Sequence, residues 1–410
     1  MEGLRGFAVL LVFFAHYVTQ VAPWMQEGSV TARIAEHIRS LGHMGVDLFF
    51  VLSGYLIYGA LIRRQRSITD FLAKRAARIY PTFLFVFGLY VVLSYTFPAE
   101  SKLPSSALAT VVYLAQNLLF LPGIVRIEPL IVVSWSLSYE FFYYLAMPLF
   151  ISALSLRDWA PARRLWLFAA ISVVGFGYYF FTTGHIRLLM FVGGILLYEI
   201  QSQKRLRVPR WSGTVALVIA VIALAVFKHA QMPGWFRYTT LFVCLSWLCL
   251  ECFTVRGGTE RVFSITPLRW LGNASYSYYL IHGLALKAFF FAFAKIHAPS
   301  GNEDLLFWAL IPAVFGITVV VSVVLYLGVE RPLSLQTAGT TGVETVKPAN
   351  PHFSWVAKIS PFNALRPALV QGVRLWHSQR TLAAMKLLRQ IAALLIPLGM
   401  GLSAWVVMII

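Results

Sequence analysis

Two ionisable residues stand in an otherwise apolar stretch near the start of the chain. Arg5 and His16 bracket the uncharged run GFAVLLVFFA. Eleven residues make nearly three full turns of an α-helix, so the two side chains face the same way, roughly 16 Å apart along the axis. Ionisable groups inside a membrane helix cost about 2.5–3.5 kcal/mol and usually mark a pathway or a site. His16 is thus a candidate general base or a histidine hydrogen-bonded across a bundle, and Arg5 binds an anion or snorkels to the membrane surface.

Two carboxylates accompany them in later apolar runs. Asp47 lies near the start of the run GVDLFFVLSGYLI, where it either caps a helix or holds one nitrogen of the His16 imidazole and fixes its tautomer. Glu140 lies near the middle of a run that contains SWSLSYEFFYY. A carboxylate at that depth needs a partner from another helix, an arginine or a histidine, either as a structural ion pair or as part of an active site.

A pair of arginines precedes another apolar run. Arg75 and Arg78 are three residues apart in FLAKRAARIYP, on one face of the expected helix and close to where it enters the bilayer. Basic loops at a cytoplasmic surface explain part of this charge. An aligned pair also suits phosphate groups, because a guanidinium binds them bidentately. The pattern indicates a phosphate-rich ligand on the cytoplasmic side.

Polar residues recur in the last part of the hydrophobic region. The run LGNASYSYYLIHG places Ser275 and His282 on an otherwise apolar helix. The sequence Glu330-Arg331-Pro332 closes the final long run and predicts a helix end there.

The composition shows what must position these residues. Of 410 residues, 59% are hydrophobic and 12% are charged, whereas soluble domains are about 45–50% apolar and about 25% charged. The three cysteines, Cys244, Cys249 and Cys252, lie together in one apolar run, so we interpret them as small buried hydrophobes and not as a disulfide or metal framework. The chain is predicted to be an all-α, polytopic membrane helix bundle.

Long apolar runs predict about ten core transmembrane helices, with a shorter, interfacial or re-entrant segment at 106–122. The expected spans are 4–22, 44–62, 79–98, 130–154, 165–183, 186–200, 211–228, 236–253, 270–296 and 304–329. With the N-terminus in the cytoplasm, 24 Lys and Arg residues fall in inner loops and 4 in outer loops. The formal net charge of +18 therefore reflects membrane topology, not nucleic-acid binding.

The organisation follows from these runs. Residues 1–332 form the transmembrane domain, and 333–363 is a turn-rich cytoplasmic linker. The stretch 364–390 is predicted to be a basic amphipathic segment, and 391–410 an additional transmembrane helix. The first run lacks the basic region and cleavage site of a signal peptide, so it is expected to be a retained helix.

Six of these motifs, taken in order, resemble the acyltransferase-3 family of integral membrane acyltransferases. They are R-x10-H, GVDLFFVLSGYLI, R-x-x-R-I-x-P, WSLSYEFFYY, SYSYYLIH and the closing ERP. The resemblance implies an enzyme of the bacterial cytoplasmic (inner) membrane. It would move an acyl group, usually acetyl, from cytoplasmic acyl-coenzyme A to a hydroxyl of an extracytoplasmic or lipid-linked glycan, such as lipopolysaccharide O-antigen or exopolysaccharide. It also implies an essential histidine, His16, and essential arginines, Arg5, Arg75 and Arg78. Glu2 stands where most members carry an aspartate. After the bundle, where many members carry a hydrolase-like domain, we expect a linker, a basic stretch and an eleventh span.

This resemblance turns the polar residues into an expected site. His16 would act as general base or carry the acyl group covalently, with Asp47 or Glu140 to orient it. Donor and acceptor are expected to contact Arg5, Arg75, Arg78, Trp135, Ser138, Ser275 and His282. We expect no metal and no permanently bound cofactor; the partners are acyl-coenzyme A, the glycan and membrane lipid, and not nucleic acid. The competing hypotheses are a flippase or exporter of a lipid-linked glycan and, less well matched by the short outer loops, a glycan polymerase or ligase.

Overall fold

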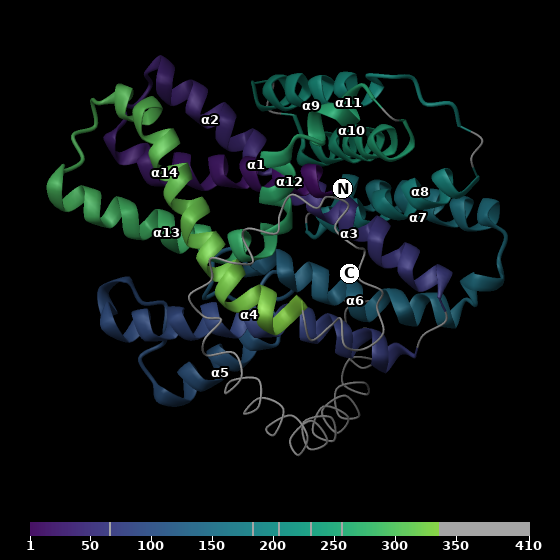
Figure 1. Cartoon of the computed structure of the whole chain (residues 1–410), viewed down its shortest axis with the longest axis horizontal. Coiled ribbons are helices and arrows are strands. Elements are labelled where there is room, and N and C mark those ends of the chain that lie inside the picture. Colours follow the sequence, from purple (N-terminus) through teal and green to yellow (C-terminus); the bar gives the residue numbers. More distant parts are fainter. Residues whose placement is uncertain (65–66, 183, 204–205, 230–231, 256, 336–410) are drawn as a thin grey trace, which may run out of the picture. The chain divides into compact units, whose positions relative to one another are not determined.

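The computed structural model describes residues 1–335 apart from 65–66, 183, 204–205, 230–231 and 256 (Figure 1). Regular structure in this part of the chain is helical, with one isolated bridge between Pro122 and Val125, so the all-α prediction is confirmed. The predicted segments 364–390 and 391–410, and nearly all of the linker 333–363, lie outside the described residues.

Fourteen α-helices and five short helical segments follow one another along the described residues. They are α1 (Glu2–Val21), η1 (Ala22–Trp24), α2 (Val30–Gly42), α3 (Met44–Arg63), α4 (Ile68–Thr96), η2 (Pro98–Glu100), α5 (Ala107–Leu118), α6 (Ser134–Ala153), η3 (Leu156–Asp158), α7 (Pro161–Phe181), η4 (Ile186–Leu188), α8 (Leu189–Gln203), α9 (Ser212–His229), α10 (Gly234–Thr254), α11 (Thr259–Phe263), α12 (Thr266–Asn273), α13 (Ser275–Ile296), α14 (Asp304–Leu325) and the π-helical η5 (Tyr326–Leu335).

The predicted spans correspond to helices, with some different boundaries. By length and composition, seven helical stretches in the described residues could cross a membrane. The predicted spans 130–154, 186–200 and 211–228 form α6, α8 and α9, which are more polar or shorter. The span 79–98 begins eleven residues earlier, at Ile68, and the span 270–296 is divided into α12 and α13. The segment 106–122 forms only the short helix α5, as expected from its length.

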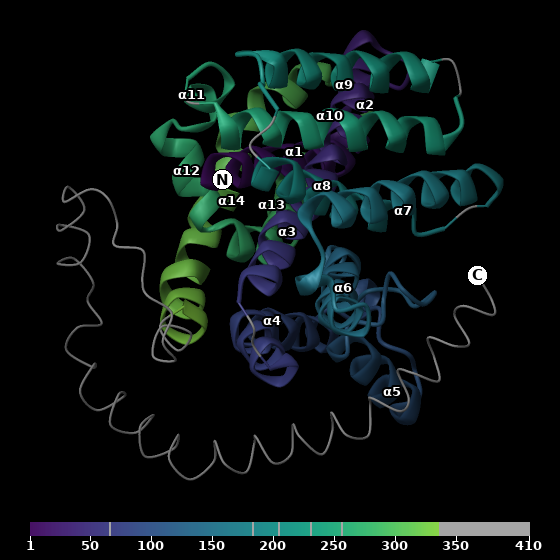
Figure 2. The ribbon, with the colours of Figure 1, turned by 90° about the vertical axis from the view of Figure 1, so that its right-hand side faces the viewer.

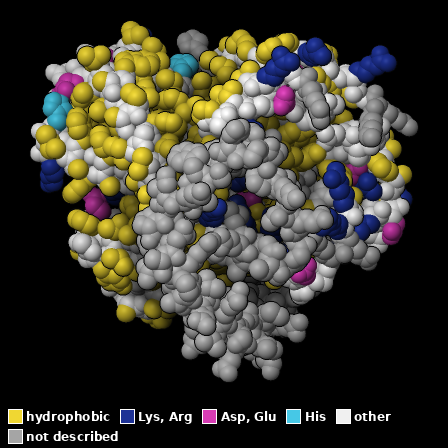
Figure 3. Space-filling model, in the orientation of Figure 1, with side chains coloured by type: hydrophobic (Ala, Val, Ile, Leu, Met, Phe, Trp, Pro, Cys, Tyr) yellow, Lys and Arg dark blue, Asp and Glu magenta, His cyan; other side chains and the backbone are white. Residues whose placement is uncertain are grey.

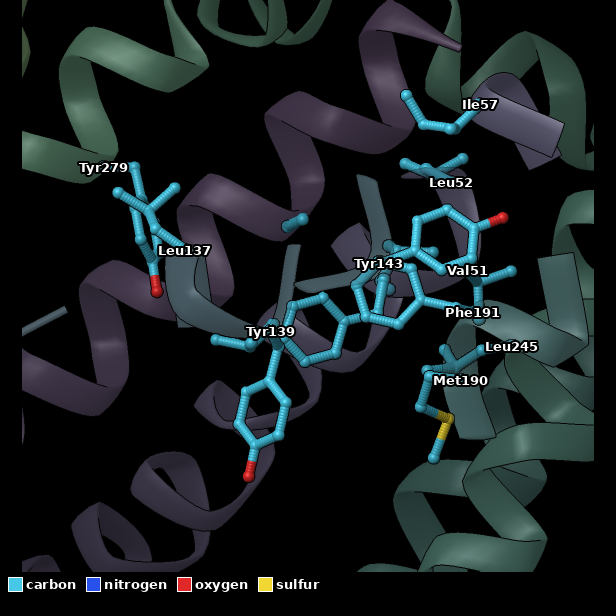
Figure 4. Packing of buried hydrophobic residues seen from close by; sticks show 14 of the residues in the cluster. Val51, Leu52, Ile57, Leu137, Tyr139, Tyr143, Met190, Phe191, Leu245 and Tyr279 are labelled. Carbon is cyan, nitrogen blue, oxygen red and sulfur yellow. The ribbon is translucent and has the colours of Figure 1, made fainter. Parts of the chain in front are cut away.

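Close backbone contact fixes how α3 crosses α8. A Cβ atom built on Gly54 would lie 2.1 Å from the Phe191 carbonyl oxygen, and one built on Gly194 would lie 2.0 Å from the Val51 carbonyl oxygen. Small residues allow such crossings in membrane bundles, where van der Waals packing replaces the hydrophobic drive between helices. Tyr143 of α6 then stacks on Phe191 at a centroid distance of 4.5 Å (Figure 4). The three helices therefore pack directly on one another.

Close packing at glycine residues also positions α1, which carries Arg5 and His16. A Cβ atom on Gly6 would lie 1.9 Å from the Leu268 carbonyl oxygen, and one on Gly272 would lie 1.8 Å from that of Glu2. Helix α1 thus packs directly on α12, and it also contacts α2, α3 and α13 (Figure 1). Neighbouring helices on several sides hold its polar side chains in place.

Helix ends that were predicted to lie on one side of a membrane contact one another. Arg164 at the start of α7 pairs with Glu199 near the end of α8 at 2.6 Å, and Arg157 donates to the Leu61 carbonyl oxygen near the end of α3. Arginine and lysine side chains gather along the right and upper-right edges in Figure 3, whereas hydrophobic side chains cover the side of α13 and α14. In Figure 2, α9 and α10 lie side by side above α7 and α8.

The fold also contains a helix that the sequence analysis did not anticipate. Helix α2 lies in the predicted outer loop 23–43 and begins where the Ser29 hydroxyl accepts a hydrogen bond from the Ala32 amide at 3.0 Å. Its residues are too polar for a span, so a search for long apolar runs passes over it. It packs on α1 and brings its C-terminal end close to the start of α3.

Candidate active site

Helices α1 and α13 place two histidines side by side. The rings of His16 and His282 have centroids 5.1 Å apart and meet edge to face, at 64°. His282 is fully buried, whereas His16 is half-buried. Within the described residues, the His16 ring forms no hydrogen bond, so its nitrogens remain available to a ligand. We call this pair of rings the histidine site.

Neighbouring groups fix the orientation and tautomer of His282. Its Nδ1 lies 2.9 Å from the Tyr278 carbonyl oxygen, which can only accept, so Nδ1 carries the proton and Nε2 carries the lone pair. The ring stacks on Tyr278 with centroids 5.2 Å apart, and the Tyr278 hydroxyl bonds Thr318 at 3.0 Å. Nε2 is buried and has no hydrogen-bond partner among the described residues. An unused acceptor therefore lies beside His16.

A second polar group lies nearer the start of α1 and α13. Arg78 of α4 pairs with Glu330 of η5 at 3.1 Å, and Glu330 also accepts hydrogen bonds from the Ser277 amide and hydroxyl at 3.0 and 2.6 Å. Glu330 is fully buried and joins three helices. The prediction of a helix end at 330–332 was wrong, because helical structure continues through Pro332 to Leu335 as a π-helix.

Two further arginines border this group, and their charges are less fully balanced. The Arg75 guanidinium lies over the rings of Phe71 and Tyr144, 5.4 and 5.6 Å from their centroids. Arg75 forms no ion pair with any described carboxylate. Arg5 lies within electrostatic range of Arg78 and of two carboxylates, Glu140 and Glu330. Three guanidinium groups thus face two carboxylates, and we call this set the arginine site.

The closest partners of Glu140 are hydroxyl groups and not the arginine or histidine that its depth predicted. Its Oε1 accepts hydrogen bonds from Ser53 at 3.0 Å and from Tyr144. Arg5 is near enough to act on it electrostatically. Glu140 therefore belongs to the arginine site, away from the pair of histidine rings.

Asp47 makes neither of the contacts that the sequence analysis considered. Its side chain is 1% exposed and accepts no hydrogen bond from a helix N–H or from His16. It forms an ion pair with Arg187 of η4, with 3.5 Å between Oδ1 and Nε. Sequence reasoning missed Arg187, although an arginine at the edge of an apolar run is the same signal that singled out Arg5.

Three further residues, Trp135, Ser138 and Ser275, were predicted to contact donor or acceptor, and they lie in different surroundings. Trp135 lies beneath the Arg187 guanidinium, 5.3 Å from the ring centroid. The Ser138 hydroxyl donates to the Ser134 carbonyl oxygen of its own helix at 3.2 Å, which satisfies it locally. The Ser275 hydroxyl is buried with no partner in the part of the chain that the structure describes. No metal-binding group of His, Cys, Asp and Glu occurs in the same residues.

The arrangement couples two kinds of chemistry along one helix. The arginine site can hold an anion, because at least one of its guanidinium groups has no carboxylate partner. The histidine site can take and return a proton. Arg5 and His16 are eleven residues apart on α1, roughly 16 Å along its axis. A ligand with a charged head and a long arm could reach both.

Comparison with known proteins gives a consistent result. A family model described as an acyltransferase domain matches residues 1–327. The chain is 29% identical over 319 residues to the acyltransferase MdmB of Streptomyces mycarofaciens, covering 70% of this chain and 78% of that protein. It is 27% identical over 311 residues to the exopolysaccharide production protein ExoZ of Rhizobium meliloti, covering 72% and 91%. It is 26% identical over 320 residues to the peptidoglycan O-acetyltransferase OatA of Listeria monocytogenes, covering 69% and 48%. No solved structure matches the chain.

Proposed function

Because this chain belongs to the acyltransferase-3 family and is a multi-pass membrane O-acyltransferase, we propose that it moves an acyl group from acyl-coenzyme A to a glycan. The donor is cytoplasmic, and the acyl group that it carries is acetyl. The acceptor is a hydroxyl of an extracytoplasmic or lipid-linked glycan, such as an exopolysaccharide or lipopolysaccharide O-antigen. The two relatives named for exopolysaccharide production and peptidoglycan O-acetylation support a glycan acceptor.

The distribution of charge supports an orientation in a bacterial inner membrane. Lys and Arg residues concentrate in the loops at one end of the bundle, where Arg164 and Arg157 hold α7, α8 and α3 together. By the positive-inside rule this end, and with it the N-terminus, faces the cytoplasm. The arginine site then lies on the donor's side and the histidine site further toward the acceptor's side.

On this proposal the arginine site binds the donor. Arg75 and Arg5 hold phosphate groups of acyl-coenzyme A, since neither has a carboxylate at ion-pair distance among the residues that the structure describes. Arg78, neutralised by Glu330, fixes the geometry of the site. The pantetheine arm then extends along α1 and delivers the thioester to His16, a distance of roughly 16 Å along the helix axis.

The histidine site carries out the transfer. His16 removes the proton from the glycan hydroxyl, and the oxygen attacks the thioester carbonyl carbon. A C–O bond forms, the C–S bond breaks, and the coenzyme A thiolate leaves with the proton that His16 held. His282, with Nδ1 protonated and Nε2 free, stands ready to accept a hydrogen bond from the His16 ring and hold its orientation. The alternative mechanism, in which His16 first carries the acyl group covalently, gives the same products.

The observation that carries the proposal is the edge-to-face contact of His16 with His282 of α13, with 5.1 Å between ring centroids, because His16 lies on α1, the helix that also bears Arg5. The test uses the purified full-length protein in nanodiscs with radiolabelled acetyl-coenzyme A and purified envelope polysaccharides. His16→Ala should abolish labelled product, whereas the exposed His37→Ala on α2 should leave it unchanged. Full activity in the His16 variant contradicts the catalytic assignment. A wild-type protein that transfers no label favours the alternative of a flippase or exporter.

A further inference from the structure

A group of basic and aromatic side chains near the histidine site takes no part in the steps above. Arg187 lies in η4, and Arg237 and Tyr238 lie in the first two turns of α10. The Tyr238 hydroxyl accepts a hydrogen bond from Arg187 Nε at 3.1 Å and another from Arg237 Nη2 at 3.2 Å. Both guanidinium groups also lie near the ring of Tyr238, 5.4 and 4.9 Å from its centroid. Two cations thus converge on one hydroxyl group.

The charges of this group are not balanced by the protein. Asp47 forms an ion pair with Arg187 at 3.5 Å and lies within electrostatic range of Arg237. Arg237 forms no ion pair with a carboxylate in the described residues. Burial lowers the pKa of His185, which is adjacent to the group, so that ring is neutral at pH 7 and adds no charge. One carboxylate faces two guanidinium groups, and like charges so close favour a bound anion.

Aromatic rings border the two arginines. Trp135 of α6 is half-buried and lies under the Arg187 guanidinium at 5.3 Å. Its ring also meets Tyr139 edge to face at 5.7 Å, and the Tyr139 hydroxyl is 2.6 Å from His185 Nδ1. Aromatic rings with a few convergent polar groups are the usual lining of a site for a small organic ligand. Sugars suit such a lining, because their C–H faces pack on rings while their hydroxyl and acidic groups meet the polar atoms.

Two side chains lie within electrostatic range of this group and close to the histidine site. His43, at the start of α3, lies within electrostatic range of Arg187, of Arg237 and of His16. Tyr279 lies beside the His282 ring, with 6.1 Å between centroids, and is within electrostatic range of Arg187. A ligand held by the two arginines would therefore lie in the same part of the bundle as the proton-transfer groups.

We propose that Arg187, Arg237, Tyr238 and Trp135 form the acceptor subsite of this enzyme, and that the subsite takes a glycan with an anionic group near the acylated hydroxyl. The inference rests on the proposed function, whose acceptor it specifies. The anionic group is a carboxylate or a phosphate, since a guanidinium fork binds either bidentately. Arg237 is the specificity-determining residue, because its charge is not matched by a carboxylate, whereas Arg187 also holds Asp47.

Direct binding tests the subsite without requiring acyl transfer. The full chain is placed in phosphatidylcholine nanodiscs, which contain no anionic lipid, and titrated calorimetrically with three tetrasaccharides of the same linkage. These consist of glucose, of glucuronate, or of glucose 6-phosphate. We expect at least one anionic form to bind about tenfold more tightly than the neutral form, which is the lower end of the ratio that one charge-assisted hydrogen bond supplies. The form that binds identifies the source of the anion.

Variants then assign the preference to Arg237. Arg237→Gln should remove the roughly tenfold preference and leave binding of the neutral tetrasaccharide unchanged. Lys295→Gln makes the same charge change on the exposed C-terminal turn of α13 and should have no effect. Arg237→Lys, which keeps the charge and loses the fork, should retain only part of the preference. Arg187 is unsuitable as a first target, because its removal leaves the buried Asp47 unpaired.

The possible results separate this proposal from the proposed function. His16→Ala should abolish transfer and keep anionic binding. Anionic binding without any transfer in the wild-type protein would refute the acyltransfer steps and leave the subsite standing. Equal binding of neutral and anionic tetrasaccharides by the wild type, or an unchanged preference in Arg237→Gln, overturns the subsite even where transfer occurs. Should that variant not fold, the salt dependence of the wild-type preference decides, because a preference unaffected by salt is not electrostatic.

Discussion

Arg75 offers a clean test of donor binding, because its removal leaves no buried charge behind. Its guanidinium lies over Phe71 and Tyr144 and has no ion-pair partner among the described residues. Arg75→Gln should therefore cost only the two cation–π contacts, about 0.5–1 kcal/mol each. A lost charge-assisted hydrogen bond to phosphate costs about 1.5–3 kcal/mol. We expect the KM for acetyl-coenzyme A to rise about 10- to 150-fold, with kcat at saturation nearly unchanged.

The assay measures acyl transfer by purified protein over a range of acetyl-coenzyme A concentrations, with a melting curve for each variant. Lys74→Gln is the matched control, since Lys74 is adjacent in sequence but pairs with the exposed Asp70 at 3.1 Å. Its KM should stay close to that of the wild type. A second donor, 3′-dephospho-acetyl-coenzyme A, identifies the phosphate. If Arg75 binds the 3′-phosphate, the losses from variant and donor should not add, because both remove one interaction.

An unchanged KM in Arg75→Gln would refute the donor role, and so would a fall in kcat with no change in KM. Arg78 cannot serve the same purpose. Removal of Arg78 leaves the fully buried Glu330 without its positive partner, which destabilises the fold by about 3–5 kcal/mol. The lower amount of folded protein would then reduce the measured activity whether or not Arg78 binds the donor. The two arginines are three residues apart, yet the structure gives one a free charge and the other a structural pair.

Three further changes test the packing and the histidine site. Gly54→Ala places a methyl group 2.1 Å from a carbonyl oxygen of α8 and should lower the melting temperature by the equivalent of at least about 1–3 kcal/mol. In the control Gly88→Ala, the new methyl group meets nothing within 4 Å, so the melting temperature should stay the same or rise. Equal melting temperatures for the two variants would disprove the close crossing of α3 and α8. Arg164→Gln removes the positive partner of the buried Glu199 and should lower the free energy of unfolding by about 3–5 kcal/mol in a denaturation assay. A decrease of less than about 1 kcal/mol would mean that the ion pair is solvated. His282→Asn should lower kcat about 10- to 100-fold without raising the KM for acetyl-coenzyme A, and a change confined to KM would assign His282 to donor binding instead.

The sequence was most informative where one physical rule decides the outcome. Long apolar runs predicted an all-α membrane bundle, and the described residues confirm it. The family resemblance, drawn from six short motifs, is confirmed by the match over residues 1–327. The ion pairs of Arg164 with Glu199 and of Arg187 with Asp47 each join helix ends that the alternation of predicted spans puts on one side, whereas the orientation read from the charge count stays a prediction.

Partner choice could not be predicted, because it depends on how helices distant in sequence are rotated. Asp47 was expected to cap a helix or to hold the His16 imidazole, but the face of α3 that carries Asp47 turns toward η4, so the carboxylate pairs with Arg187. Glu330 ends an apolar run and reads as a helix stop, yet three hydrogen-bonding and ionic contacts from Ser277 and Arg78 keep it inside a continuing π-helix. The depth of a side chain in the membrane follows from counting residues along one helix. The helix that the side chain faces can be known only from the positions of the neighbouring helices.

The separation of the arginine and histidine sites constrains how donor and acceptor meet. Phosphate groups are costly to move into an apolar bundle, so on the proposed function they stay where the uncompensated arginines lie, near Arg5 and Arg75. Only the uncharged pantetheine arm and its thioester need to advance along α1 to His16. The glycan is too polar to cross and must approach from the other end, where Arg187 and Arg237 lie. An enzyme built this way never opens a continuous polar path through the bundle. A labelled donor should therefore leave its acyl group, but not its coenzyme, on the acceptor side of sealed vesicles, and coenzyme A found there would contradict the arrangement.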